Sequence, residues 1–261
     1  MSATENNANG PYFAPMTRLY SDLAHLYDAL YQTFIDYDAE FALYTQLLTS
    51  QSAQSVLEIG CGSGHLASRF VAAGYDYTGV DNSPEMLEMA RRRCPEAHFE
   101  LADMRTLHLE RAYDAILITA RSLSYILTNA DVLSTFRHLQ NHFAPTGTLH
   151  FDFIDATTFL PGLNPDAVVE HRAVYDGQPY LRQSRYTPNL TTGFGWNWHS
   201  DFFIEQPDQP LQPVAQDDAT LRAFLPDEIR LFLQLAGLTV FAEKRQPTYA
   251  FDTWIVSARK A

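Results

Sequence analysis

The stretch V-L-E-I-G-C-G-S-G-H, residues 56 to 65, decides the fold. An apolar run leads directly into three glycines spaced as G-x-G-x-G, and residues Leu66 to Ala73 then have helical periodicity and stop before Gly74. A strand that enters a helix through a glycine turn leaves free backbone N–H groups at the helix start, and these favour a negatively charged ligand group. The stretch therefore predicts a βα unit with a ligand-binding loop at its centre.

The chain repeats this pattern after residue 66. Short apolar runs alternate with segments of helical period, which is typical of βα units and of a parallel sheet. The expected strands are residues 56–60, 77–80, 98–102, 113–119 and 148–154, with two more near the end of the chain at 239–244 and 250–258. We therefore expect an α/β fold, with a doubly wound, mostly parallel seven-stranded sheet and helices on both faces.

The segments that flank this core have a different character. Before it, two aromatic-rich helices are expected to form a cap over one edge of the sheet, and after the fifth strand comes an antiparallel β-rich insertion. In the insertion, Trp196 and Trp198 share an apolar strand face that is expected to be core, and residues 206–218 are expected to be a surface loop. The expected division is a disordered tail at 1–16, a helical cap at 17–51, the core at 52–166 and 219–261, and the insertion at 167–218.

Composition limits the partners. The chain has 18 Lys and Arg against 31 Asp and Glu, a formal net charge of −13, so it repels nucleic acid and anionic lipid headgroups. The opening residues show no export signal, and the two cysteines are too few for a disulfide framework, so a cytoplasmic location is expected. No His pair has the spacing of a metal site, and no metal is expected.

Two aspartates extend the signal from the glycine loop. Asp81 lies 21 residues after Gly60 and Asp103 lies 22 residues further on, each at the end of an expected strand. Either one alone could be a helix cap or a solvated side chain. Together with the loop they mark three strand ends that meet in one crevice, where open α/β sheets bind ligands and a carboxylate can hold ribose hydroxyls. A dinucleotide fingerprint would place its third glycine at position 65, which is His65 here.

With these residues the chain resembles the class I S-adenosylmethionine-dependent methyltransferases, over residues 52–155 and again after Ala219. The resemblance implies a Rossmann-like fold and S-adenosylmethionine as cofactor. It implies a glycine loop around the methionine portion, a ribose-binding aspartate, residues that flank or read the adenine, and two residues near the sulfonium. The residues implied, in chain order, are Glu58, Gly60, Cys61, Gly62, Gly64, Asp81, Asn82, Met86, Asp103, Met104, Thr119 and Ala120.

A narrower similarity points to the N-methyltransferases of amino sugars. The L-Y-D at 26–28 and the D-Y at 36–37 look like the aromatic helix that covers the cofactor in that group, which makes Tyr27 and Tyr37 candidates for its carboxylate or amino group. Where the sugar enzymes tend to carry a histidine, this chain has Tyr125. The insertion does not match closely enough to transfer any substrate contact.

The reaction implied is in-line displacement of the sulfonium methyl by a small-molecule acceptor, with an amine among the candidates. Alignment of the reactants can supply most of the acceleration, so the protein need only receive a proton, through water, Tyr125 or a nearby histidine. His150, on the fifth strand, either faces the substrate or is satisfied by its neighbours. Both remain catalytic candidates at this point.

Alternatives stay open. The chain could be a non-catalytic cofactor-binding protein or an NAD-dependent oxidoreductase, and methylation of protein is compatible with the charge, whereas methylation of RNA is disfavoured by it. The sequence does not identify the acceptor or say whether N, O or C is methylated. The insertion could line the substrate site or form an interface, so a monomer or a homodimer through the insertion is expected.

Overall fold

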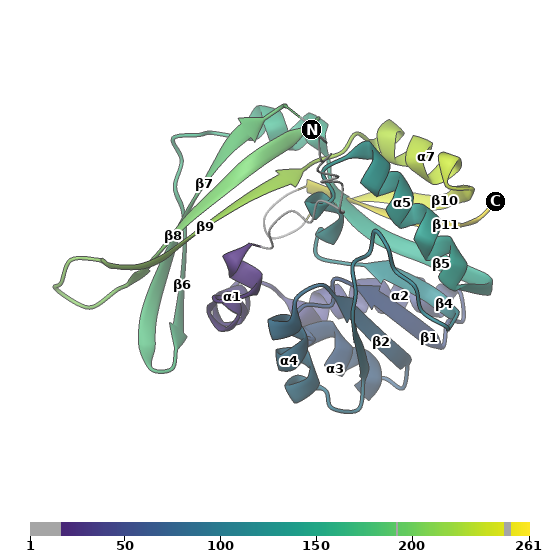
Figure 1. Cartoon of the computed structure of the whole chain (residues 1–261), viewed down its shortest axis with the longest axis horizontal. Coiled ribbons are helices and arrows are strands. Elements are labelled where there is room, and N and C mark those ends of the chain that lie inside the picture. Colours follow the sequence, from purple (N-terminus) through teal and green to yellow (C-terminus); the bar gives the residue numbers. More distant parts are fainter. Residues whose placement is uncertain (1–16, 192, 248–251) are drawn as a thin grey trace, which may run out of the picture.

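The computed structural model describes residues 17–191, 193–247 and 252–261 (Figure 1). The tail expected at residues 1–16 lies outside the described residues. Within the described residues no helix is both long and apolar enough to cross a membrane. The chain forms a large mixed sheet covered by helices and a second, smaller antiparallel sheet that extends away from it.

The large sheet has seven strands in the order β10-β11-β5-β4-β1-β2-β3. Strands β3, β2, β1, β4 and β5 are parallel, and β11 and β10 complete the sheet antiparallel to their neighbours. The mostly parallel seven-stranded sheet predicted from the sequence is confirmed. Its strands are β1 Ser55–Ile59, β2 Asp76–Asp81, β3 His98–Leu101, β4 Tyr113–Ile118, β5 Phe143–Ile154, β10 Leu238–Pro247 and β11 Asp252–Lys260.

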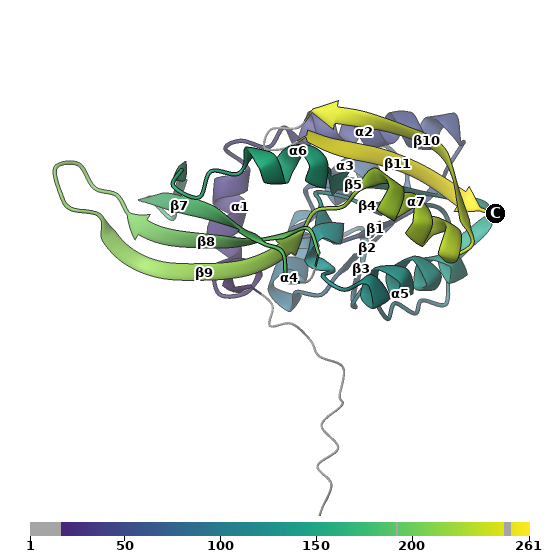
Figure 2. The same ribbon diagram turned by 90° about the horizontal axis from the view of Figure 1, so that it is seen from above.

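Helices cover both faces of this sheet because successive side chains of each central strand point to opposite sides. Leu57 and Ile59 of β1 pack with α5 and α7, whereas Val56 packs with α2 and α3 (Figure 2). The helices are α1 Ala24–Tyr31, α2 Tyr37–Ser50, α3 His65–Ala72, α4 Pro84–Arg93, α5 Asn129–Leu139, α6 Ala156–Phe159 and α7 Pro226–Leu235. Short 3₁₀ turns are η1 Arg18–Tyr20, η2 Ser122–Tyr125, η3 Gln140–His142 and η4 Leu160–Gly162.

The second sheet has the order β6-β7-β8-β9 and is antiparallel throughout. Its strands are β6 Val169–Tyr175, β7 Gln178–Asn189, β8 Gly195–Ile204 and β9 Gln212–Arg222. The antiparallel insertion after the fifth strand is therefore confirmed. The expected core face is present as well, since Trp196 and Phe202 of β8 are both almost completely buried.

The surface loop expected at 206–218 is wrong over most of its length. Strand β9 begins at Gln212 and continues without a break to Arg222, so the second half of the expected loop is part of a strand. The sequence of this segment is typical of a loop because it is polar and contains Pro213. It forms a strand because β9 is the edge of its sheet, where one side meets solvent and a missing N–H is tolerated.

The N-terminal cap divides into two parts with different partners. Helix α2 packs on the large sheet, with Tyr44 and Leu48 buried in its core. Turn η1 and helix α1 instead pack on the second sheet, with Leu26 and Leu30 against Phe202 (Figure 1). Helix α1 therefore lies between the two sheets, and the first of the two expected cap helices is broken into η1 and α1.

Candidate active site

A cavity of about 560 Å³ opens at the carboxyl ends of the parallel strands. That volume lies within the range of small-molecule and cofactor sites. Its wall is built by three parts of the chain: the strand ends of the large sheet, the η1–α1 segment, and strands β8 and β9 of the second sheet. The lining residues are Thr17, Tyr20, Tyr27, Ile59, Gly60, Gly62, Val80, Asp81, Asn82, Ala102, Asp103, Met104, Arg105, Ala120, Ser122, Tyr125, Ile126, Leu127, Asn197, Asp218, Ala219 and Thr220.

The glycine loop forms the floor of this cavity. The N–H groups of Gly60 and Cys61 donate to the carbonyl of Val80 at 2.7 and 3.0 Å, which fixes the loop to the end of β2. Gly60 has φ +74°, and a Cβ there would collide with the hydroxyl of Ser122. Gly62 has φ +53° and has no atom within 4 Å of the position where a Cβ would be. The backbone at Gly62 is therefore open to a ligand in the cavity.

Asp81 holds the glycine loop as well as lining the cavity. One carboxylate oxygen accepts from the N–H of Gly62 at 2.8 Å and the other from the N–H of Ser83 at 2.9 Å. Burial raises the pKa of Asp81 despite these bonds. Because a carboxylate offers about four acceptor positions and the neighbouring backbone N–H groups do not use all of them, Asp81 retains capacity for a ligand hydroxyl.

Asp103 lines the cavity in an ion pair that the sequence analysis missed. The guanidinium of Arg105 donates to Asp103 through Nε at 2.9 Å and through Nη2 at 2.5 Å, and the Arg105 N–H donates to the same carboxylate at 2.8 Å. Burial alone would raise the pKa of Asp103, but the bonds from Arg105 lower it. The L-A-D-M-R sequence contained the signal, since an arginine two residues after an aspartate can reach it.

Glu58 lies beneath the loop and does not line the cavity. Its carboxylate accepts from the hydroxyl of Tyr77 at 2.5 Å and from that of Thr119 at 2.7 Å. Burial raises the pKa of Glu58 to about 7, although both hydrogen bonds act in the opposite direction. Cys61 and Met86 are likewise buried, and neither they nor Gly64 line the cavity.

Tyrosines form the roof. The hydroxyls of Tyr20 and Tyr125 are 2.5 Å apart, and the ring of Tyr20 also contacts that of Tyr27 with centroids 5.1 Å apart. Tyr20 was not among the residues expected from the sequence, and nothing in its neighbourhood marked it. Tyr37 does not line the cavity, because its ring stacks on His65 with centroids 4.0 Å apart.

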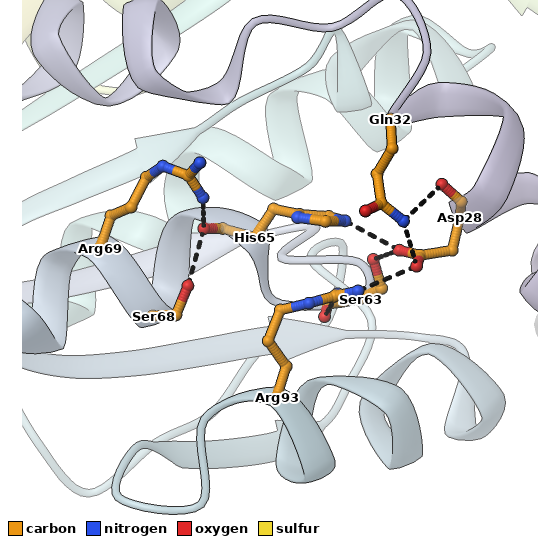
Figure 3. Close-up of polar contacts among 7 residues, drawn as sticks. All are labelled: Asp28, Gln32, Ser63, His65, Ser68, Arg69 and Arg93. Carbon is orange, nitrogen blue, oxygen red and sulfur yellow. Dashed lines mark hydrogen bonds and ion pairs between the residues drawn. The ribbon is translucent and has the colours of Figure 1, made fainter.

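The roof is joined to the floor by a polar cluster around Asp28 of α1 (Figure 3). The hydroxyl of Ser63 donates to the Asp28 carboxylate at 2.5 Å, and His65 Nε2 and Arg93 Nη2 each lie 2.9 Å from it. Arg93 also donates to the Ser63 carbonyl. Burial would raise the pKa of Asp28, but the bonds from His65 and Ser63 and the charge of Arg93 lower it to about 2. Asp28 is therefore a buried anion.

The second sheet supplies the remaining wall. Asn197 of β8 and Asp218 and Thr220 of β9 face the cavity, and the hydroxyl of Thr220 donates to Asn197 Oδ1 at 3.0 Å. These residues are on the strand face opposite the tryptophans. The sequence alone could not connect this face to the site, because the connection depends on how β9 pairs with β8 and runs along η2.

The structure does not bring His150 to the cavity. Its side chain is almost completely buried in the middle of β5, where the two ring nitrogens lie 2.9 Å from the Thr148 hydroxyl and 2.8 Å from the Ser257 hydroxyl. Burial lowers the pKa of His150 to about 4. Of the two readings that the sequence left open, these contacts are those of a residue satisfied by its neighbours.

Comparison with known proteins places the chain in a family. A family model described as a methyltransferase domain matches residues 56–147. The chain is 30% identical over 197 residues to dTDP-4-amino-2,3,4,6-tetradeoxy-D-glucose N,N-dimethyltransferase of Saccharopolyspora spinosa, covering 69% of this chain and 78% of that protein. The chain belongs to the S-adenosylmethionine-dependent methyltransferases. The resemblance seen in the sequence is confirmed, and the oxidoreductase and the non-catalytic binding protein are set aside.

Solved structures agree on the fold of this methyltransferase. The sugar N-methyltransferase KedS8 from Streptoalloteichus superposes with a TM-score of 0.73 at 20% identity, covering 98% of both chains. The amino pentose methyltransferase CalS10 from Micromonospora echinaspora, solved with S-adenosylmethionine bound, superposes with a TM-score of 0.72 at 21% identity, covering 89% of this chain and 96% of that one.

The cofactor of this methyltransferase is S-adenosylmethionine, and the residues present fit it. The open side of Gly62 leaves room for a ligand against bare backbone. The Asp81 carboxylate keeps acceptor capacity for a hydroxyl, and the paired Asp103 and Arg105 offer acceptors and donors at the next strand end. The three strand ends singled out in the sequence thus line one cavity of suitable size.

Proposed function

We propose that this enzyme methylates the amino group of a small molecule of the amino-sugar type. The observation that carries the proposal is the similarity to the Saccharopolyspora relative, whose name describes dimethylation of an amino sugar, together with a polar cavity wall from the second sheet. When bound, the cofactor supplies a sulfonium methyl: the nitrogen lone pair forms the new N–C bond and the C–S bonding pair remains on sulfur.

We assign the cofactor contacts as follows. Gly60 and Gly62 hold the methionine portion, Asp81 accepts from the ribose hydroxyls, and Asp103 with Met104 meets the adenine. Glu58 and Thr119 support the loop from below, because they bond to each other and not to the cavity. The remaining contacts assigned are Asn82 beside the adenine and Ala120 near the sulfonium, with Tyr27 at the methionine end, where it borders the acceptor as well.

The turn after β4 positions the reacting groups. Ala120 and Arg121 both adopt left-handed backbone angles, with φ +54° and +61°, which is uncommon for residues other than glycine. The turn is held from below, since the Arg121 N–H donates to the buried carboxylate of Asp152 at 2.8 Å. Strained, well-anchored backbone of this kind is found at functional sites, where it fixes geometry before the ligands arrive.

Tyr125 is not suited to act as a base. Burial raises its pKa above that of a free tyrosine, and its hydroxyl is paired with that of Tyr20. A phenol of this kind stays protonated at neutral pH and cannot take up a second proton readily. We therefore assign removal of the ammonium proton to water at the mouth of the cavity, and the acceleration chiefly to alignment of the reactants.

A transfer assay tests this function. The enzyme is incubated with S-adenosylmethionine labelled in the methyl group and with amino sugars, each paired with the sugar that has a hydroxyl in place of the amine. Label should enter the amino compounds alone. Asp81→Ala should abolish transfer at low cofactor concentration, whereas Asp76→Ala, at the exposed start of β2, should not. Label in the hydroxyl compounds alone would contradict the proposal.

Two further features of this enzyme follow from the sequence alone. We infer a cytoplasmic location, without a nucleic-acid or membrane partner, from the charge of −13 and the two free cysteines. We also retain the division into cap, core and insertion, and a monomer or a homodimer through the insertion. Size-exclusion chromatography with light scattering decides between the last two.

A further inference from the structure

Three tyrosine rings meet at one corner of the cavity. Tyr20 of η1, Tyr27 of α1 and Tyr125 of η2 all line it. The ring of Tyr20 makes angles of 68° with Tyr27 and 76° with Tyr125, at centroid distances of 5.1 and 5.5 Å. The ring of Tyr20 thus stands at a steep angle to each of the other two, so the tyrosines line this corner in more than one plane.

The rings are held in place by contacts outside the cavity. The hydroxyls of Tyr20 and Tyr125 bond to each other at 2.5 Å, and the Ser83 hydroxyl donates to the Tyr20 carbonyl at 2.6 Å. The ring of Tyr27 rests against that of Tyr31 with centroids 3.8 Å apart. Because the Tyr20 and Tyr125 hydroxyls are used on each other, the rings are the principal surface that these two residues offer to a ligand.

The charge of the cavity favours a cationic ligand. Its described lining residues include three carboxylates, of Asp81, Asp103 and Asp218, and one basic side chain, Arg105, which is paired with Asp103. Aromatic faces attract cations through the ring quadrupole, and surrounding rings are the usual recognition device for methylated ammonium groups.

We propose that Tyr20, Tyr27 and Tyr125 form an aromatic cage that binds the acceptor nitrogen as an N-methylated ammonium group. The inference rests on the proposed function, which it deepens, because it defines the acceptor as an amine that stays bound after one methylation. Each transfer leaves one positive charge in the site, on nitrogen instead of sulfur. A secondary or tertiary ammonium then loses its proton to water before the next transfer, and a quaternary one has none to lose.

Binding of two matched probes tests the cage without any turnover. The enzyme is saturated with S-adenosylhomocysteine and titrated with choline and with 3,3-dimethylbutan-1-ol, which has the same shape but a carbon in place of the charged nitrogen. Choline should bind at least tenfold more tightly. Equal affinities would overturn the proposal, because shape and apolar contact would then explain all of the binding.

Two variants at one position separate the ring from its hydroxyl. Tyr20→Phe keeps the aromatic face and should keep the preference for choline to within threefold, whereas Tyr20→Leu should lose most of it. Identical behaviour of Phe and Leu would overturn the assignment of this ring. Binding of S-adenosylhomocysteine reports whether each variant is folded, and the same pair at Tyr125 replaces a variant that is not.

The outcome is independent of the transfer assay. Label incorporated into amines by an enzyme that does not prefer choline would leave the proposed function intact and remove the cage. A clear preference for choline in an enzyme that labels no amine would support the cage and contradict the proposed function.

Discussion

The carboxylate of Asp28 accepts a 2.5 Å hydrogen bond from the hydroxyl of Ser63, so helix α1, which carries Tyr27 of the roof, is tied directly to the glycine loop. Arg93 at the end of α4 contacts both residues, since it donates to the Asp28 carboxylate and to the Ser63 carbonyl. Hydrogen bonds and an ion pair therefore connect helix α1, on the roof side of the cavity, to the glycine loop at its floor.

Replacing Asp28 should therefore weaken cofactor binding although Asp28 does not line the cavity. In Asp28→Asn the charge opposite Arg93 is lost and one acceptor becomes a donor, which costs about 1–3 kcal/mol in a buried network. We expect roughly a tenfold loss of affinity for S-adenosylhomocysteine in calorimetric titration. Asp22→Asn, which changes an exposed aspartate just before the same helix, is the control and should bind as the wild type does. Equal affinities in the two variants would show that the link is not needed.

The same residue should affect acid stability. The pKa of Asp28 is about 2 in the folded protein against 3.8 for a free aspartate, so the folded state binds its proton less readily. Its stabilising contribution is present above pH 4 and is lost as the pH falls toward 2, by about 1–2 kcal/mol after allowance for solvent screening. Denaturant unfolding between pH 5 and pH 2.5 should show a smaller fall in stability for Asp28→Asn than for the wild type. Parallel curves would contradict this.

Glu58 should make the stability of the fold depend on pH in the opposite sense to Asp28. Its pKa is about 7 in the folded state against 4.5 when free, so above pH 4.5 the unfolded state loses the proton first. Stability therefore falls as the pH rises from 4.5 to 7, by up to roughly 3 kcal/mol for a shift of this size. Glu58→Gln keeps one acceptor for Thr119 or Tyr77 and does not ionise. The unfolding free energy of Glu58→Gln should vary less between pH 4.5 and pH 7 than that of the wild type. The change in stability caused by the substitution should become smaller as the pH approaches 4.5.

Part of the site could be predicted from the sequence for a simple geometric reason. Gly60, Asp81 and Asp103 each follow a parallel strand, and the carboxyl ends of neighbouring parallel strands meet at one edge of the sheet. Local sequence fixes each strand end, so the three residues could be placed together without knowledge of any long-range contact.

The other wall could not be predicted because it depends on long-range pairing. Asn197 reaches the cavity only because β8 pairs with β9, with Asn197 opposite Thr220, and β9 returns along η2. The first half of β9 was missed because segment 206–218 is polar, and an edge strand does not need an alternating apolar face. His150 shows the reverse case: its position on β5 suggested the site, but its side chain is buried in the middle of the strand against Ser257 and does not line the cavity.

The wall from the second sheet should control the acceptor and leave the cofactor unaffected. Asn197 and Thr220 line the cavity on the side away from the glycine loop, and Asn197 Oδ1 is fixed by donors from Thr220 and Asn189. Asn197→Ala removes a polar group that a bound acceptor would use, at a cost of about 1–1.5 kcal/mol. The KM for the amine should rise roughly tenfold while the affinity for S-adenosylhomocysteine is unchanged. Gln183→Ala, on the far side of β8 in the same sheet, is the matched control. A parallel loss of cofactor affinity in Asn197→Ala would mean that the second sheet supports the whole cavity and does not select the acceptor.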